Sequence, residues 1–443
     1  MPLLLLSSSP PRLPQLAVAS SSSQMSTAPS AIRSTKPLVD RAIIVGGGLG
    51  GLSVALQLRK IGIEAEVYER NSALSGGEGT LISLFPNGCK ALNEASPDVV
   101  QKMRASGILN NPAHLIYPDG TPFGEWSLST QMEEKYGQPL IAILWKNALN
   151  ILGEALPEEC KHFGYECFGI TQEDDGAVAH FKKEDETISV KAPLVIGADG
   201  IRSAVRTAIF GNIPPRDNGR TMWRAVIDMD LCSSQGLKAG SYASLFNGRT
   251  VFIINGVQDK LYWAFSVEDD YVEGSTKIRS KTPEEMKERL LNYFEGFSLA
   301  TSIIQVTEPT LILERRVLDF PVLSTWFQGN TVLLGDAVHA VTPSLGQGAN
   351  LAFEDGMQLA KLLRSSADLR SALEEYQAMQ MPRARQISKQ SQARDVRVFC
   401  LYKYYNRLIQ QNGQTTQQHN LLSSQVFTFA MDFNVGKCQL NKS

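Results

Sequence analysis

The sequence of 443 residues lacks a long hydrophobic run, an excess of charge of either sign and any cysteine pair at metal-binding spacing. No stretch reaches the roughly 18 consecutive apolar residues that a transmembrane helix needs, so we expect a soluble or at most peripherally membrane-bound protein. The formal net charge of −2 gives no basic footprint for nucleic acid. The six cysteines form no C-x-x-C pair, so we expect reduced thiols and no metal site.

Residues 1–37 lack acidic side chains and differ from the rest of the chain. They contain ten serines and several prolines, and Arg12, Arg33 and Lys36 are their only charged residues. The apolar run Leu3 to Leu6 is too short for a membrane span, and a secretory signal would need a longer apolar block. This composition favours a plastid-type transit peptide and a chloroplast location over a disordered tail of a cytoplasmic protein or an extension before a start at Met25.

Three glycines near the start of the remaining chain have the spacing of a dinucleotide-binding turn. Gly46, Gly48 and Gly51 follow the short β-rich run Ala42 to Val45 and precede a helical pattern over Leu52 to Lys60. The first glycine permits a tight turn, the second lets the backbone approach a pyrophosphate, and the third lets helix and strand pack closely. The helix N-terminus then offers N–H groups and a positive dipole to phosphate.

An acidic residue completes this unit. The second expected strand, Ala65 to Tyr68, is followed by Glu69, eighteen residues after Gly51. A carboxylate there accepts hydrogen bonds from a ribose diol and repels a 2′-phosphate. The unit therefore favours FAD or NAD over NADP. No second G-x-G-x-x-G occurs, so we expect a nicotinamide donor to bind transiently across a groove.

The middle of the chain alternates between helical and extended patterns. We expect helices over 89–106 and 139–156, an extended segment over 113–128, and strands of a meander over 177–181 and 187–190. Between 220 and 315 the strand-like runs 222–229, 250–254 and 261–267 dominate, and 283–294 is the clearest helix. This block predicts a mostly antiparallel sheet that forms a wall of a substrate pocket.

A second glycine-rich passage lies near the end of the chain. The buried strand Val332 to Leu334 leads into Gly335 and Asp336, and small residues at 346–350 precede a long helix. Asp336 at a strand end can bind a ribitol or ribose hydroxyl. The backbone N–H groups at the start of the helix can face a phosphate or the electron-rich edge of a reduced flavin.

From about residue 40 to 395 the sequence resembles the single-component FAD-dependent aromatic hydroxylases and epoxidases, which include 4-hydroxybenzoate, salicylate, urate and kynurenine hydroxylases and plant zeaxanthin epoxidase. Three motifs in the family's order carry the resemblance: GGGLGG at 46–51 with Glu69, GADGIRSAVR at 197–206, and GDAVHAVTPSLGQGANLAFED at 335–355. Smaller similarities are ISLFPNG at 82–88 and TMWRAV at 221–226.

The resemblance implies a set of FAD-binding residues. It assigns the ADP half of FAD to Gly46, Gly48, Gly50, Gly51, Glu69 and Arg70, the ribityl chain to Asp336, and the flavin ring to Gly346, Gln347, Gly348, Ala349 and Asn350, with Ser83 near the ring. Asp199 belongs to the loop that the family uses between FAD and the nicotinamide donor. Lys146 stands where the family usually has an FAD-contacting arginine, and lysine lacks the bidentate fork. No catalytic side chain and no metal ligand is assigned.

The implied fold is α/β: a Rossmann-like FAD-binding domain with an inserted, mainly antiparallel β-sheet substrate domain and a C-terminal helical segment. We expect the FAD-binding domain to be discontinuous, over 38–215 and 316–395, with part of the substrate domain within 110–165. The substrate-domain sheet would span 216–315, and a helical tail 396–443. This tail, with an aromatic run at 427–433, could pack on the core or lie on a membrane surface.

The implied reaction uses NAD(P)H and O2 to hydroxylate or epoxidise a small aromatic, heterocyclic or isoprenoid substrate through a flavin hydroperoxide. The alternatives are an FAD-dependent reductase of the geranylgeranyl reductase type, and a non-enzymatic protein with a vestigial FAD site. No W-x-W-x-I-P run supports a flavin halogenase. The absence of a C-terminal phosphopeptide-binding-type domain disfavours a carotenoid substrate.

Several conspicuous side chains have structural as well as functional interpretations. We expect His339 to be structural, because the flavin would supply the redox chemistry. Trp223 and Trp263 could line a pocket but are more typical of a core. Asp199 could pair with Arg202 to stabilise a turn, and residues 315–316 could be either a solvated arginine pair or a flavin contact.

Overall fold

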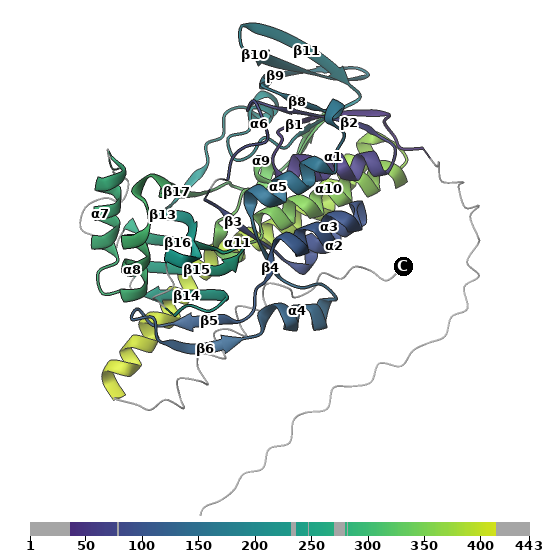
Figure 1. Cartoon of the computed structure of the whole chain (residues 1–443). Helices are drawn as coiled ribbons and strands as arrows, with labels where there is room; N and C mark the ends of the chain where they lie inside the picture. Colours follow the sequence, from purple (N-terminus) through teal and green to yellow (C-terminus); the bar gives the residue numbers. More distant parts are fainter. Residues whose placement is uncertain are drawn as a thin grey trace, which may run out of the picture. The chain divides into compact units, whose positions relative to one another are not determined.

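The computed structural model describes residues 36–77, 79–231, 236–246, 248–269, 280 and 282–412, without the side chains of residue 123 and of 393–412. Almost all of the expected transit peptide, and the aromatic run at 427–433, therefore lie outside the described residues. Within the described residues the chain is a mixed α/β fold with a Rossmann-like sheet and a second, larger sheet, as predicted (Figure 1).

The Rossmann-like sheet has six strands in the order β18-β19-β12-β1-β2-β8. In chain order they are β1 (Arg41–Val45), β2 (Glu64–Glu69), β8 (Lys161–Phe163), β12 (Leu194–Gly197), β18 (Phe327–Gln328) and β19 (Thr331–Leu333). Neighbours are parallel except β18 and β19. Val45 pairs with Gly197, which pairs with Leu333, so three strands end side by side. Loops that follow these strands are brought to one edge of the sheet.

Helices cover one face of this sheet, and a small sheet lies against its other face (Figure 1). The helices are α1 (Leu49–Lys60), α2 (Pro86–Ala95), α3 (Pro97–Ser106), α5 (Trp145–Glu154) and α10 (Gly348–Ser365). The small antiparallel sheet consists of β9 (Glu166–Glu173), β10 (Gly176–Lys183) and β11 (Glu186–Ala192), which confirms the predicted meander. The strands β1, β12 and β19 are buried almost completely between these layers, which suits their Val/Ile/Leu-rich sequences.

The larger sheet has seven strands in the order β17-β13-β16-β15-β14-β5-β6. They are β5 (Ala113–Ile116), β6 (Pro122–Trp126), β13 (Arg216–Asp228), β14 (Gly240–Phe246), β15 (Arg249–Val257), β16 (Lys260–Glu268) and β17 (Leu313–Asp319). All neighbours are antiparallel except β14 and β5. Two strands from the 110–165 region thus join a sheet built mainly by 216–319.

Each face of the seven-stranded sheet has its own apolar cluster. On one face, α7 (Pro283–Tyr293) and α8 (Ser298–Val306) pack against Trp223, Trp263 and Phe265. On the other, Ile254, Tyr262 and Ala264 of the sheet pack against Leu81 and Ala142. Leu81 and Ala142 belong to a small antiparallel sheet of β3 (Leu81–Leu84), β7 (Ile141–Leu144) and β4 (Ile108–Leu109). This second cluster joins the seven-stranded sheet to the small β3-β7-β4 sheet.

Two expected helices differ from the structure. The single helix expected over 89–106 is wrong, because α2 and α3 are separate and Pro97 begins the second one. The wholly helical interpretation of 139–156 is also wrong, because residues 141–144 form β7 before α5 begins at Trp145. The run IAIL is fully apolar, and a buried strand and a buried helix cannot be distinguished by periodicity over so few residues.

The remaining helices are short except the last. They are α4 (Leu128–Tyr136), α6 (Ala204–Phe210), α9 (Asp336–His339) and α11 (Leu369–Asn412), with 3-10 turns η1 (Glu158–Cys160), η4 (Pro309–Leu311) and η5 (Pro343–Leu345). Helix α11 contacts α10 and β14, and it provides the predicted C-terminal helical segment. No described helix combines the length and apolar character needed to cross a membrane.

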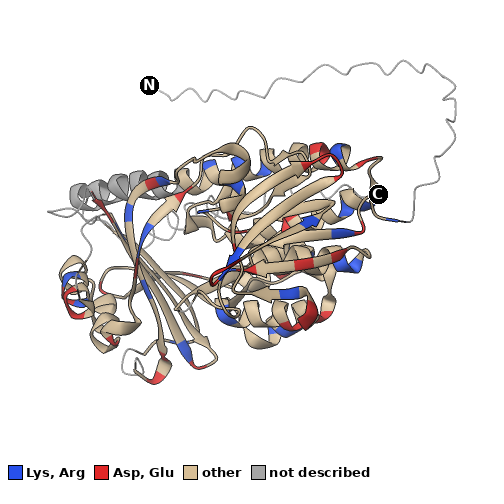
Figure 2. Ribbon diagram, turned by 90° about the horizontal axis from the view of Figure 1, so that it is seen from above, with Lys and Arg blue, Asp and Glu red and all other residues tan. Residues whose placement is uncertain are grey.

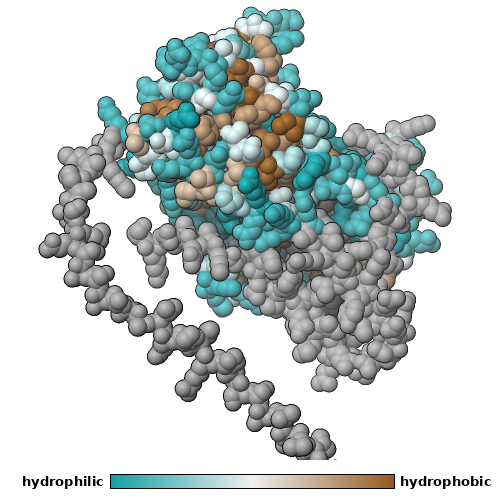
Figure 3. All heavy atoms as spheres, turned by 180° about the vertical axis from the view of Figure 1, so that it is seen from behind, coloured by the Kyte–Doolittle hydropathy of each residue, from teal (hydrophilic) through white to brown (hydrophobic). Residues whose placement is uncertain are grey.

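Charged residues of both signs alternate along the strands and helices (Figure 2), in keeping with the formal net charge of −2. Seen from behind, the described surface mixes hydrophilic residues with smaller apolar areas (Figure 3). Among the cysteines whose side chains the structure describes, Cys89, Cys160 and Cys167 are buried and free. Burial raises the pKa of the Cys89 and Cys167 thiols to about 12, so neither is a thiolate at neutral pH.

Candidate cofactor site

The turn between β1 and α1 has no room for side chains at its first and last glycines. A Cβ at Gly51 would lie 1.9 Å from the carbonyl oxygen of Gly46, and a Cβ at Gly46 would lie 2.5 Å from that of Ala198. Gly46 also has φ +109°, which side-chain-bearing residues rarely adopt. These two glycines let β1, α1 and the 197–203 loop approach one another.

The second glycine of the turn faces open space instead. A Cβ at Gly48 would meet nothing within 4 Å, and no side chain caps the N-terminus of α1. Beside it, Glu69 Oε2 accepts a 2.7 Å hydrogen bond from Gly47 N, and Oε1 accepts bonds from Asn71. A carboxylate has further lone pairs, so this geometry leaves Glu69 able to accept from a ligand hydroxyl. Arg70 is exposed.

A contact at Ala352 brings the distant motifs together. Cβ atoms added at Gly50 and at Gly335 would lie 3.2 and 3.1 Å from Ala352 Cβ, and Ala352 is in the second turn of α10. The beginnings of α1 and α10 and the turn after β19 therefore converge, although Gly50 and Ala352 are far apart in sequence. Two helix N-termini at one place create a favourable environment for negative charge.

Asp336 lies at this meeting point. Its side chain is exposed, yet the surrounding protein raises its pKa by desolvation, and the nearby His339 opposes that shift. Among the described residues nothing hydrogen-bonds to this carboxylate. The side chain can be reached from solvent, but the surrounding protein limits its hydration. Such a carboxylate, without a partner among the described residues, is suited to accept a hydrogen bond from a ligand hydroxyl.

Asn350 connects the start of α10 to β3. Its Oδ1 accepts from Phe85 N at 2.9 Å, and its Nδ2 donates to the carbonyl oxygens of Ser83 and Gly346 at 2.9 and 2.8 Å. A Cβ at Gly88 would lie 2.1 Å from Asn350 Oδ1, which explains the glycine of ISLFPNG. Asn350 thus holds Ser83 beside the 346–350 loop.

The other members of this loop are arranged around the helix N-terminus. Gly346 adopts φ +63°, and Gly348 and Ala349 begin α10, which no side chain caps. Gln347 is buried; its Oε1 accepts from Asn87 at 3.0 Å, whereas its Nε2 has no partner. An unpaired buried amide is costly unless a ligand accepts from it.

His339 forms a buried pair with Asp355 behind the turn. His339 Nε2 lies 2.6 Å from Asp355 Oδ2, which also accepts from Gly335 N at 2.9 Å. Burial alone would lower the pKa of His339, but the adjacent Asp355 carboxylate raises it above its usual value. The pair fixes the Gly335 backbone, and it supports the structural interpretation of His339.

Asp199 accepts hydrogen bonds from the first turn of α6, whose N-cap is Ser203. Its carboxylate accepts from Ser203 Oγ and from the backbone N–H groups of Ala204 and Val205 at 2.7 and 3.1 Å. The alternative of a turn-stabilising Asp199–Arg202 pair is wrong, because Arg202 is exposed and no such contact exists in the described part of the chain. Arg206 instead ties this loop to the third motif, through a 2.7 Å bond from Nη1 to the carbonyl oxygen of Ala337.

The remaining residues singled out from the sequence are two core tryptophans, a paired arginine and an exposed lysine. Trp223 and Trp263 are core residues, with Nε1 groups that donate to Glu314 and Thr307. Arg316 pairs with carboxylates, so the solvated-pair interpretation of residues 315–316 is wrong for it. Lys146 is exposed in the first turn of α5, next to Trp145, whose ring packs on Gly77.

The sequence analysis assigned no role to Arg206, Asp355 or Arg224, although all three lie in the motifs at 197–206, 335–355 and 221–226. Asp355 gave a signal, since an acidic residue on an otherwise apolar helix stretch must find a buried partner. Within the described residues no group of three His, Cys, Asp or Glu side chains could hold a metal.

The arrangement fits FAD. Gly48 leaves space at one helix N-terminus, Glu69 can accept from a ribose, and Asp336 is an unpartnered carboxylate between the two helices. At the second helix N-terminus, the buried Gln347 amide lacks an acceptor. A long ligand with a diol, a pyrophosphate and a polyol chain satisfies all four positions. The fold and the site therefore define a flavoprotein of the Rossmann-like class.

Comparison with known proteins agrees with this class. Residues 129–391 match the FAD binding domain family, and residues 44–80 match the NAD(P)-binding Rossmann-like domain. The chain belongs to the FAD binding domain family. Relatives that it resembles are named as monooxygenases and as an FAD-dependent urate hydroxylase.

Two relatives and one solved structure illustrate the similarity. The chain is 32% identical over 342 residues to chloroplastic zeaxanthin epoxidase of Spinacia oleracea, covering 73% of this chain and 47% of that protein. It is 29% identical over 349 residues to aurachin C monooxygenase/isomerase of Stigmatella aurantiaca, covering 77% and 85%. Klebsiella pneumoniae HpxO, complexed with FAD and uric acid, shares the fold at a TM-score of 0.75 and 23% identity, covering 89% and 96%. The chain thus spans about half of the plant epoxidase.

Proposed function

We propose that this protein uses NAD(P)H and O2 to hydroxylate or epoxidise a small aromatic, heterocyclic or isoprenoid substrate. The observation that carries the proposal is the convergence of the distant motifs at 46–51 and 335–355 at Ala352. FAD, when bound, would supply the transfer of electrons and of one oxygen atom. The protein supplies binding, orientation and exclusion of water.

Each group of residues has a definite task in this proposal. Gly46, Gly48, Gly50, Gly51, Glu69 and Arg70 would hold the ADP half of FAD, Asp336 the ribityl chain, and Ser83, Lys146 and Gly346 to Asn350 the flavin half. Asp199, which accepts from the first turn of α6, would shape the loop past which the nicotinamide donor binds. We assign substrate binding to 216–315 together with β5 and β6, and FAD binding to 38–215 and 316–395.

Exclusion of water is the task of the second apolar cluster, which lies between the seven-stranded sheet and the small β3-β7-β4 sheet. Leu81, Ile254 and Ala264 are buried, and Tyr262 adds an aromatic wall. An apolar wall keeps water from the reacting atoms and strengthens every polar contact made beside them. A substrate bound there would be held close to the 346–350 loop.

A test of the proposal begins with the purified chain. We expect it to bind FAD, and we expect a substrate from a panel of aromatic, heterocyclic and isoprenoid compounds to stimulate NADPH oxidation together with O2 uptake. Product formation without O2 uptake would indicate a reductase instead. Failure of the protein to bind FAD would contradict the cofactor assignment itself.

Asp336→Asn tests the residue assignment. The variant should bind FAD about tenfold more weakly, because an amide is a poorer acceptor than a carboxylate. The raised pKa of Asp336 means that ionisation costs the apoprotein stability as pH rises through that pKa, so the variant apoprotein should be no less stable at neutral pH. Asp185→Asn, in an exposed turn, is the control and should change neither property. Unchanged FAD affinity in Asp336→Asn would contradict the assignment.

A chloroplast location also belongs to this proposal. The acid-free, serine-rich composition of residues 1–37 supports it, and so does the chloroplastic location in the name of the spinach relative. Residues 1–40 fused to a fluorescent protein should direct it to chloroplasts in leaf cells. Diffuse cytoplasmic fluorescence would contradict the location without affecting the enzyme chemistry.

A further inference from the structure

Arg224 lies on β13, the second strand of the seven-stranded sheet, on the face that packs against the small β3-β7-β4 sheet. On β13 it is paired with Ala264 of β16 on one side and Leu313 of β17 on the other. Its sequence neighbours Trp223 and Ala225 belong to the cluster beneath α7 and α8. Successive side chains of a strand alternate between faces, so Arg224 is on the opposite face, where Met222 and Val226 pack with the second cluster.

This guanidinium has no anionic partner. In the part of the chain that the structure describes, no carboxylate pairs with Arg224, and its Nε is buried without a hydrogen bond. Burial lowers the pKa of Arg224; the Tyr262 hydroxyl opposes this shift, and the like charge of Arg315 adds to it. The Tyr262 ring lies on the same face, and burial raises the pKa of its hydroxyl to about 12. Both polar groups are therefore held in apolar surroundings.

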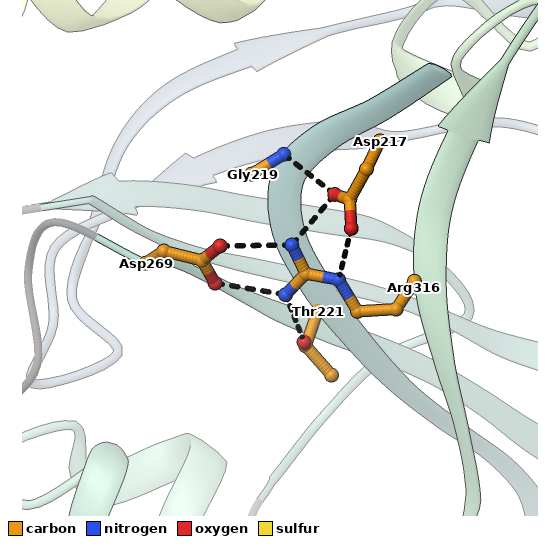
Figure 4. Close-up of polar contacts among 5 residues, drawn as sticks. All are labelled: Asp217, Gly219, Thr221, Asp269 and Arg316. Carbon is orange, nitrogen blue, oxygen red and sulfur yellow. Dashed lines mark hydrogen bonds and ion pairs between the residues drawn. The ribbon is translucent and has the colours of Figure 1, made fainter. Parts of the chain in front are cut away.

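Several other arginines in and beside this sheet are paired with carboxylates. Arg316 of β17 contacts Asp217 and Asp269, with Nη2 2.6 Å from Asp217 Oδ1 and Nη1 2.8 Å from Asp269 Oδ1 (Figure 4). Arg289 pairs with Glu314 at 2.6 Å, and Arg220 pairs with Glu268. These carboxylates hold the pKa of Arg316 well above its usual value. Arg224 differs from all three.

The face that carries Arg224 is continuous with the candidate FAD site. A Cβ at Gly79 would lie 3.2 Å from Leu313 Cδ1, so the loop before β3 covers the neighbour of Arg224. Leu81 packs with Tyr262, and two residues further along β3 the Ser83 carbonyl accepts from Asn350 of the 346–350 loop. Strand β3 therefore leads directly from the surroundings of Arg224 to the flavin-side loop.

We propose that Arg224 binds the carboxylate of an organic acid whose apolar body lies against the second cluster, and that this makes the protein selective for acidic substrates. The proposal rests on the proposed function, because it places the substrate on this face of the sheet. It selects among the substrate classes above: an aromatic, heterocyclic or isoprenoid acid is favoured, and a neutral carotenoid is disfavoured.

The physical reason is that the Arg224 guanidinium destabilises the protein when no anion is bound to it. A guanidinium that has lost part of its hydration and gained no anion is destabilising, and a carboxylate offers two parallel hydrogen bonds to its planar fork. A neutral amide of the same shape offers one acceptor and no charge. Lysine would keep the charge but lose the bidentate geometry.

The test compares acids with neutral molecules of the same shape on the FAD-loaded protein. The probes are 2-naphthoate against 2-naphthamide and geranate against geraniol, and dissociation constants come from perturbation of the flavin absorbance and from calorimetry. We expect at least one acid to bind about tenfold more tightly than its neutral counterpart. Arg224→Gln should abolish this preference, and Arg224→Lys should keep part of it.

Arg315→Gln is the matched control, because it removes an exposed charge from the same face. It should change the preference by less than about threefold. Loss of the preference in Arg315→Gln but not in Arg224→Gln would overturn the proposal. Equal binding of acid and neutral probes by the unaltered protein, or failure of every acid to bind, would overturn it as well.

Failure of this inference can be distinguished from failure of the proposed function. A protein that binds FAD and oxidises NADPH with a neutral substrate, but shows no preference for acids, contradicts only the role of Arg224. A protein that binds no FAD contradicts the proposed function. Retention of FAD by Arg224→Gln serves as the check that the variant is folded.

Discussion

The cofactor-binding half and the seven-stranded sheet accommodate charge in opposite ways. At the meeting point of α1 and α10, small residues let backbone segments approach closely, and Asp336 is left without a partner. On the seven-stranded sheet and the helix α7 that covers it, Arg316, Arg220 and Arg289 are paired with carboxylates, whereas no described carboxylate pairs with Arg224. Within the described residues, each half thus contains a desolvated charge that no opposite charge pairs with: the Asp336 carboxylate in one and the Arg224 guanidinium in the other.

The difference shows how the two halves divide the work. A polyol ligand presents hydroxyl donors, which a carboxylate recognises, whereas a substrate acid presents acceptors, which a guanidinium recognises. Paired charges contribute to folding, and unpartnered ones are available to ligands. Substitutions at the two kinds of position should therefore separate stability from binding.

The largest effect is expected in the glycine turn. Gly51→Ala places a Cβ 1.9 Å from the Gly46 carbonyl oxygen, so it should destabilise the protein by about 3 kcal/mol or more and abolish FAD binding. Gly48→Ala meets no protein atom within 4 Å and has φ −75°, so the apoprotein should be as stable as the unaltered one while FAD binds more weakly. Thermal unfolding and FAD titration measure the two properties. Equal stability of the two variants would contradict this account of the turn.

The second largest loss of stability is expected when the buried pair of His339 and Asp355 is broken. Removing one partner of a buried pair leaves the other uncompensated, so His339→Gln should cost about 3 kcal/mol at pH 6. The pKa of His339 is raised in the folded protein, so its stabilisation is complete below the unfolded pKa of about 6.5 and is lost as pH rises through the folded value. The difference in unfolding free energy between the unaltered protein and the variant should therefore shrink as pH rises.

His180→Gln is the control for this measurement, because His180 lies on the small outer sheet and hydrogen-bonds only hydroxyl groups. It should show no comparable change with pH. A stability difference for His339→Gln that grows as pH rises would reverse the predicted sign and would mean that the folded protein holds His339 neutral.

The third effect contrasts the two arginines directly. Arg316→Met leaves Asp217 and Asp269 without their shared partner, so it should destabilise the protein by about 2 kcal/mol. Arg224→Met removes a desolvated charge that has no partner, so its stability should be unchanged or higher. Denaturant unfolding of both variants measures the contrast. A larger loss of stability in Arg224→Met than in Arg316→Met would contradict the claim that the paired arginine, and not Arg224, contributes to folding.

The sequence predicted the elements whose signals are local. The glycine spacing, the apolar run before it and Glu69 after it are within thirty residues, and β1, α1 and β2 occur where they were expected. The IAIL run of β7 gave no such signal, because its four apolar residues fit either a strand or a helix. Pro97 did give a signal for the break between α2 and α3, since proline is favoured in the first turn of a helix.

Features that depend on pairing between distant strands could not be predicted. Arg224 and Arg316 look alike in the sequence, and only the register of β13 with β16 and β17 shows that one meets Ala264 and Leu313 whereas the other meets carboxylates. The exposure of Asp336 likewise depends on the convergence of α1 and α10. The sequence therefore predicted the types of residue in the site better than their partners.

The smallest effect is expected at Lys146. Arginine at this position would restore the fork that the family usually has, so Lys146→Arg should tighten FAD retention by a few-fold. Its side chain is exposed and no ion pair involves it in the described part of the chain, so stability should not change. Lys90→Arg on α2 is the control. Unchanged or weaker retention would count against a contact between Lys146 and FAD.

The central claim is that O2 supplies an oxygen atom to the product on a protein-bound FAD. The most direct measurement is a reaction under isotopically labelled O2 with the FAD-loaded protein, NADPH and the best substrate from the panel, followed by mass spectrometry of the product. One labelled oxygen atom per product molecule is the expected result. A product that carries no label, or whose added oxygen comes from water, would contradict the account.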